Sequence, residues 1–88
     1  MRTCVLDWGR LTSKEELHKF LMEELNLPAW YGRNLDALYD CLTEQAEDIE
    51  FLYSNEEQTE KGLENYSKAL KKVIQDAAKE NPRIKVMI

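Results

Sequence analysis

The spacing of three short apolar segments along the chain constrains its fold most strongly. These segments are Thr3–Leu6, Ile49–Tyr53 and Ile84–Ile88, and each carries β-branched or aromatic residues between polar neighbours, which is typical of a strand. The connections between them are long and have helical periodicity. Strands joined by helical crossovers pair in parallel, with right-handed connections. The sequence therefore predicts a single α/β domain over residues 1–88, built on a three-stranded parallel sheet.

Two helices are predicted in the first connection. The sequence Ser13-Lys-Glu-Glu16 has the capping-box pattern that opens a helix, and Asn34 is a good N-cap for the second helix. Asp36 suits the first turn of that second helix, because the helix dipole favours negative charge there. The predicted core face of the first helix consists of Leu17, Phe20, Leu21 and Leu25.

Two more helices are predicted in the second connection, which gives the order β-α-α-β-α-α-β with four helices. A second capping-box sequence, Ser54-Asn-Glu-Glu57, predicts a short third helix that stops near Gly62. The last helix ends at Asn81-Pro82, since the residue before a proline avoids the helical conformation. Its predicted core face consists of Leu63, Tyr66, Leu70, Val73 and Ala77.

The charge of the chain is concentrated in its middle third. Between Asn34 and Glu60 there are nine acidic residues and no lysine or arginine, in a protein with a net charge of −5. Such a surface repels nucleic-acid phosphates and attracts a basic protein. The alternative interpretation is a solvated acidic surface that only keeps the protein soluble.

The remaining composition predicts a monomeric cytoplasmic protein that does not enter membranes. No apolar run approaches the roughly 20 residues that span a bilayer. Asp7 comes too early for a secretory signal. Cys4 and Cys41 lack the spacing of a disulfide framework or a metal site, so buried reduced thiols, no metal and no cofactor are expected.

The segment 27–43 predicts a rigid aromatic loop followed by a helix with two faces. Leu35, Leu38 and Leu42 form its apolar face. The polar face carries two carboxylates at i and i+4, which repel each other by roughly 0.2–0.5 kcal/mol. A face that adds nothing to the core and carries this penalty is a candidate binding surface. Its residues are Asp36, Tyr39, Asp40 and Thr43.

Residues outside this helix extend the candidate surface. Trp30 and Tyr31 are adjacent in an extended loop, so their side chains point in opposite directions and one of them should face solvent. Asp76 and Glu80 repeat the i, i+4 acidic spacing on the last helix. Asp76 also has a simpler explanation, because Lys72 is placed to pair with it.

Catalytic motifs are absent, and no catalytic residue is predicted. A nucleophilic pair of Cys41 and His18 is an alternative, but it lacks a third orienting group and a local signature. His18 is expected to be an ordinary half-exposed residue. A hydrolase with paired carboxylates would need one acid in an apolar pocket, whereas these acids lie on polar faces.

The stretch Leu27-Pro-Ala-Trp-Tyr-Gly-Arg-Asn-Leu-Asp-Ala-Leu-Tyr-Asp-Cys-Leu-Thr43 resembles the central signature of the barstar family. Members of this family are intracellular inhibitors of secreted bacterial ribonucleases of the barnase type. The Tyr-Gly-x-Asn-Leu-Asp-Ala-Leu core, Tyr31 to Leu38, is specific, and the length and element order match across the whole chain. Outside this motif the residue identities are weak.

The resemblance implies a protein that occludes a ribonuclease active site with its second helix and the preceding loop. Asp40 would be the central anchor at the position of an RNA phosphate, with Asp36 as a second carboxylate. Trp30 would stack on the rim, and Tyr39 and Thr43 would pack beside Asp40. Asp76 would face the edge of the enzyme.

Four residues depart from the family pattern. Tyr39 stands where tryptophan is common, and Arg33 adds a positive charge beside the acidic face. Glu44 and Gln45 stand where the well-known inhibitor of this family has a glycine and an aromatic residue. These departures concern which nuclease is recognised, and they leave open an acidic interaction module for a basic partner that is not a nuclease.

Overall fold

The three predicted strands form one parallel sheet. In the computed structural model, which describes residues 1–87, β1 (Arg2–Asp7), β2 (Ile49–Ser54) and β3 (Ile84–Met87) lie in the order β1-β2-β3. The register aligns Cys4 with Phe51 and Phe51 with Val86. The α/β prediction with a parallel sheet is confirmed, while Ile88 lies outside the described residues.

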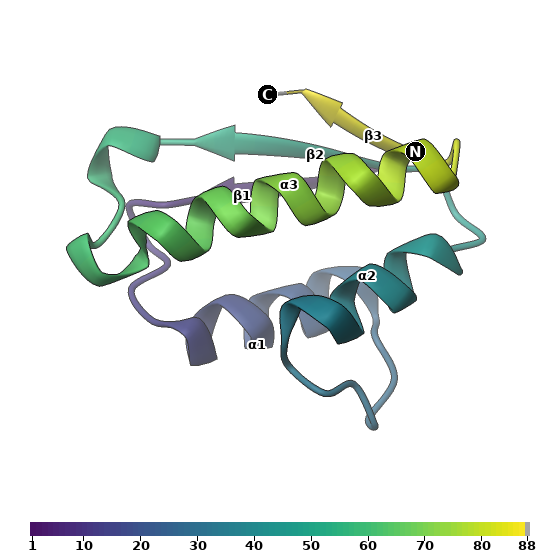
Figure 1. Cartoon of the computed structure of the whole chain (residues 1–88), viewed down its shortest axis with the longest axis horizontal. Coiled ribbons are helices and arrows are strands. Elements are labelled where there is room, and N and C mark those ends of the chain that lie inside the picture. Colours follow the sequence, from purple (N-terminus) through teal and green to yellow (C-terminus); the bar gives the residue numbers. More distant parts are fainter. Residues whose placement is uncertain (88) are drawn as a thin grey trace.

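Three α-helices accompany the sheet in the described residues: α1 (Lys14–Leu25), α2 (Leu35–Thr43) and α3 (Glu64–Glu80). They run opposite to the strands, and α3 crosses in front of the sheet while α1 and α2 lie below it (Figure 1). Helix α2 packs against α3. The segment 26–34, which joins α1 to α2, forms the loop at the lower edge of the molecule (Figure 1).

The helices cover one face of the sheet. Cys4, Leu6 and Phe51 point toward this face and are fully buried, whereas Val5 and Met87 on the opposite face are exposed. Right-handed crossovers in a sheet of order β1-β2-β3 place every helix on the same side of the sheet. Buried and exposed side chains therefore alternate along the strands. The hydrophobic core therefore lies between this one face and the three helices.

The prediction of a short third helix is wrong. Two 3₁₀ turns, Glu56–Gln58 and Lys61–Leu63, take its place. Ser54 still belongs to β2, and Asn55 adopts a left-handed conformation (φ 56°) without a capping hydrogen bond from its side chain. The left-handed residue redirects the chain, so the capping box cannot form and the helix does not propagate.

The core faces of the helices differ from the prediction at several positions. In α1, His18 is buried while Phe20 is only half-buried. In α3, Ile74 is buried, whereas Tyr66 and Val73 are half-buried. These shifts correspond to a small rotation of each helix, which the choice of packing partner determines.

Both helix caps predicted in the first connection are confirmed. The Ser13 hydroxyl accepts the amide hydrogen of Glu16 at 3.1 Å, and the Asn34 side-chain oxygen accepts that of Ala37 at 2.8 Å. The Glu16 carboxylate does not complete a reciprocal box with Ser13. It accepts a hydrogen bond from the Thr12 hydroxyl at 2.8 Å instead.

The C-terminal end of α2 is held by a buried side chain from the end of α3. The Asn81 amide nitrogen donates to the carbonyl oxygens of Leu42 at 2.9 Å and Gln45 at 3.1 Å. The Leu42 carbonyl is one of the last four of α2, which a helix end leaves without an intrahelical partner, and Gln45 lies two residues beyond the helix. Asn81 therefore fixes where α2 stops.

We expect Asn81→Ala to reduce the free energy of unfolding by about 1–3 kcal/mol, because the side-chain hydrogen bonds from Asn81 to the carbonyl oxygens of Leu42 and Gln45 are lost. Urea denaturation measures the difference. The control is Asn65→Ala, which alters an exposed residue of the same helix and should change stability by no more than about 0.5 kcal/mol. Equal losses for the two variants would contradict the capping role.

Candidate functional site

Helix α2 has the two faces that its sequence predicts. Leu38 and Leu42 are fully buried in the core, and Cys41 is also buried. Asp36 and Asp40 are exposed on the opposite side. The Asn34 cap fixes the start of this short helix and Asn81 binds its end. The two carboxylates therefore lie on a helix that is held at both ends.

The carboxylates of Asp36 and Asp40 are available to a partner. Within residues 1–87, no ion pair or side-chain hydrogen bond of this chain reaches them. Beside them, Tyr39 and Thr43 are half-buried, and the Thr43 hydroxyl donates to the carbonyl oxygen of Asp40 at 2.9 Å. The exposed face of α2 therefore presents unpaired negative charge next to an aromatic ring.

The loop before α2 presents one aromatic side chain and buries the other. Trp30 is 76% exposed, whereas Tyr31 is 4% exposed. This confirms that one of the two faces solvent. Arg33, also exposed, adopts a left-handed conformation (φ 54°) that turns the loop into the start of α2.

His18 anchors this loop, and the prediction that it is half-exposed is wrong. It is 2% exposed. Its Nδ1 is hydrogen-bonded to the Tyr31 hydroxyl at 2.7 Å and its Nε2 to the Tyr66 hydroxyl at 2.6 Å. The imidazole thus joins α1, the loop and α3. A sequence signal existed, because His18 lies three residues before Leu21 and seven before Leu25, on the core stripe of the helix.

The electrostatics of Cys41 and His18 do not support a nucleophilic pair. Burial, followed by the charges of Glu44 and Asp40, raises the pKa of the Cys41 thiol, whereas a nucleophilic cysteine needs a lowered one. Burial and then Arg33 lower the pKa of His18. Both ring nitrogens of His18 are already hydrogen-bonded to tyrosine hydroxyls.

Asp76 is the predicted site residue that lies on α3 rather than on α2 or the loop before it. Its carboxylate oxygens lie 3.6 Å from Lys72 Nζ and 4.0 Å from Lys79 Nζ. No hydrogen bond or ion pair among the described residues links it to α2. The pairing with Lys72 matches the simpler explanation of this residue, and a contact with a partner stays a prediction.

A groove beside the acidic face was not anticipated from the sequence. It has a volume of about 180 Å³ and lies between the loop and the C-terminal end of α2. Its lining includes Leu27, Pro28, Trp30, Cys41, Glu44 and Gln45.

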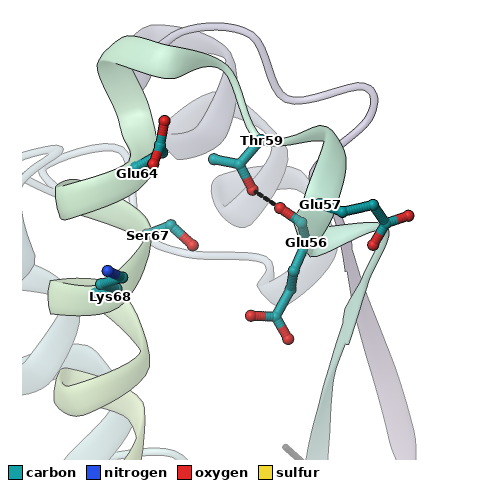
Figure 2. A pocket seen from close by; sticks show the side chains of 6 residues that line it. All are labelled: Glu56, Glu57, Thr59, Glu64, Ser67 and Lys68. Atoms are coloured by element: carbon teal, nitrogen blue, oxygen red, sulfur yellow. Dashed lines mark hydrogen bonds between the residues drawn. The ribbon is translucent and has the colours of Figure 1, made fainter.

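A second hollow, of about 270 Å³, lies between the 3₁₀ turns and α3. Figure 2 shows Glu64, Ser67 and Lys68 on α3 opposite the turn, with the Thr59 hydroxyl donating to the Glu56 carbonyl oxygen at 2.6 Å. The Glu56 carboxylate pairs with Lys71 at 3.1 Å. The lining also holds Glu57, Glu64 and the cation Lys68, so the hollow is of mixed charge, whereas α2 carries two exposed carboxylates and no basic residue.

Two classes of site find no support in the residues that the structure describes. Across positions 1–87, no three histidine, cysteine or acidic side chains gather as they would to hold a metal ion. None of the helices in this range has the length and apolar character needed to cross a membrane.

The fold and the exposed surface together define a small α/β protein with an acidic helix beside an outward-facing tryptophan. The profile of one family, described as "Barstar (barnase inhibitor)", matches residues 1–88. The chain is also 37% identical over 81 residues to the "Putative ribonuclease inhibitor YrdF" of Bacillus subtilis (strain 168). This alignment covers 91% of the chain and 89% of the relative. The chain belongs to the barstar family.

Proposed function

We propose that the protein inhibits a barnase-type ribonuclease by inserting α2 and the preceding loop into the cationic active site of the enzyme. Asp40 is the central anchor, Asp36 is a second carboxylate, and Trp30 packs on the rim. Tyr39 and Thr43 fill the space beside Asp40, and Asp76 contributes at the edge. The protein itself performs no chemical step in this proposal.

The observation that carries the proposal is the pair of unpaired carboxylates on one exposed helix face. A ribonuclease active site is cationic because it binds RNA phosphates. Carboxylates form short, charge-assisted hydrogen bonds with arginine and lysine, and Asp36 and Asp40 have no competing partner among residues 1–87. Membership of the barstar family and the resemblance to a protein described as a ribonuclease inhibitor support the same conclusion.

The anchoring of the surface also supports inhibition. Side chains and loops that become ordered only on binding reduce affinity. Here the Asn34 cap, the Asn81 side chain and the hydrogen bonds of His18 hold α2 and the loop in the free protein. A surface organised in this way loses little conformational entropy when it docks.

We expect the purified protein to abolish cleavage of a fluorogenic RNA by a barnase-type ribonuclease at near-stoichiometric ratio. A ribonuclease of unrelated fold is the control and should stay active. Full nuclease activity with excess protein would contradict the proposal. Capture of a basic protein that is not a nuclease would then favour the acidic interaction module.

A further inference from the structure

The groove between the loop and the end of α2 combines three kinds of surface. Leu27, Pro28 and Cys41 make its wall apolar. Trp30 adds an indole that is 76% exposed. Glu44, which is also exposed, adds a carboxylate where α2 ends.

Among the described residues, the charged side chain in the lining of the groove is that of Glu44. The lining contains no lysine or arginine, and none of the ion pairs formed within residues 1–87 involves Glu44. Glu44 and Cys41 line the same groove, and Glu44 and Asp40 both contribute to raising the pKa of Cys41. The C-terminal end of a helix adds partial negative charge, and the last turn of α2 holds no basic residue.

A guanidinium group fits this combination better than an ammonium group does. It is planar and weakly hydrated, it stacks on aromatic rings, and it binds a carboxylate through two parallel hydrogen bonds. An ammonium group is compact and strongly hydrated, so it gains less from an apolar wall. An apolar side chain would leave the negative charge of Glu44 without compensation.

We propose that this groove receives an arginine side chain of the ribonuclease, with the guanidinium stacked on Trp30 and paired with Glu44. The inference rests on the proposed function, and it names a contact outside the Asp36 and Asp40 pair. Gln45 at the rim can accept one further hydrogen bond from the same group.

The test compares Glu44→Gln with Glu57→Gln in the full-length protein. Both variants remove one exposed negative charge and keep the shape of the side chain, but Glu57 lies on the 3₁₀ turn Glu56–Gln58. We expect Glu44→Gln to weaken binding of the barnase-type ribonuclease by about tenfold. Glu57→Gln should weaken it by less than about threefold, because only long-range attraction is lost.

A double-mutant cycle tests whether Trp30 and Glu44 hold the same group. Trp30→Leu and Glu44→Gln should be non-additive, so that the combined loss of affinity is smaller than the product of the two single losses. Phenylglyoxal, which modifies arginine, identifies the occupant. One nuclease arginine should be protected in the wild-type complex and become reactive in the Glu44→Gln complex.

The outcomes separate this inference from the function on which it rests. If the wild-type protein binds the nuclease but Glu44→Gln and Glu57→Gln weaken binding equally, the inference alone is wrong. The same holds if the Trp30 and Glu44 effects multiply, or if no arginine changes its reactivity. If the wild-type protein does not bind the nuclease, the proposed function fails and the inference fails with it.

Discussion

Replacing Asp40 with alanine is expected to weaken binding of a barnase-type ribonuclease by about 2–5 kcal/mol, the largest loss of any single substitution on the α2 surface. The carboxylate stands on the exposed face of α2, and no ion pair within residues 1–87 neutralises it. In the proposed complex it replaces an RNA phosphate. Its removal leaves enzyme cations buried and unpaired, and this desolvation penalty makes the loss large.

Glu57→Ala is the matched control for this prediction. Glu57 is an equally charged, exposed residue on a 3₁₀ turn, so its removal changes the net charge by the same amount. We expect it to lower the association rate slightly at low salt and to leave the dissociation rate unchanged. Asp40→Ala should raise the dissociation rate, which surface plasmon resonance measures separately.

The stability of the two variants must be compared as well. Asp40 has no side-chain partner in residues 1–87, so Asp40→Ala should unfold at nearly the same urea concentration as the wild-type protein. Equal binding losses for Asp40→Ala and Glu57→Ala would remove the anchor role. A loss of binding that came only with unfolding would remove it too.

The second large effect is on stability and concerns His18. We expect His18→Phe to reduce the free energy of unfolding by about 2–4 kcal/mol, because the hydroxyls of Tyr31 and Tyr66 lose their partners. Tyr31 is 4% exposed, so a water molecule cannot readily replace the lost hydrogen-bond partner of its hydroxyl. Urea denaturation followed by circular dichroism measures the change.

The double variant His18→Phe with Tyr31→Phe separates hydrogen bonding from packing. Replacing both partners of a buried hydrogen bond with apolar groups of similar shape is nearly neutral. We therefore expect the double variant to be more stable than His18→Phe alone. A further loss in the double variant would show that the tyrosine hydroxyl contributes through other contacts.

The same histidine makes stability depend on pH. Burial, followed by Arg33, lowers the pKa of His18 in the folded protein below its usual 6.5, so the unfolded chain binds more protons in that range. Stability contributed by the neutral imidazole is present above pH 6.5 and is lost as the pH falls toward the lowered value. Between pH ~7.5 and pH ~5.5 the wild-type protein should lose more stability than His18→Phe does.

The sequence was sufficient wherever local chemistry decides the structure. Ser13 and Asn34 cap their helices because a side-chain oxygen satisfies an amide within the same turn, and this needs no distant residue. The prediction that one of Trp30 and Tyr31 faces solvent is also confirmed, although the segment is a turn closed by a hydrogen bond from the Tyr31 amide to the Pro28 carbonyl oxygen and not an extended backbone. The parallel sheet follows from the length of its crossovers.

The sequence was insufficient wherever two distant segments must meet. Two capping-box patterns have the same local appearance, yet only the one at Ser13 opens a helix, since Asn55 turns left-handed at the second. The presence of a polar residue in the sequence does not reveal whether its side chain is buried. His18 on α1 and Asn81 beyond α3 are buried because their partners come from other elements.

By itself, the sequence determined the strands, three of the helices, the first two caps and the acidic face of α2, because periodicity and capping act over a few residues. Only the tertiary structure decided that His18 and Asn81 hold the loop 26–34 and the end of α2, and that Glu44 and Trp30 share a groove. These features depend on contacts between segments that are distant along the chain. Such contacts form only once the helices have packed on the sheet.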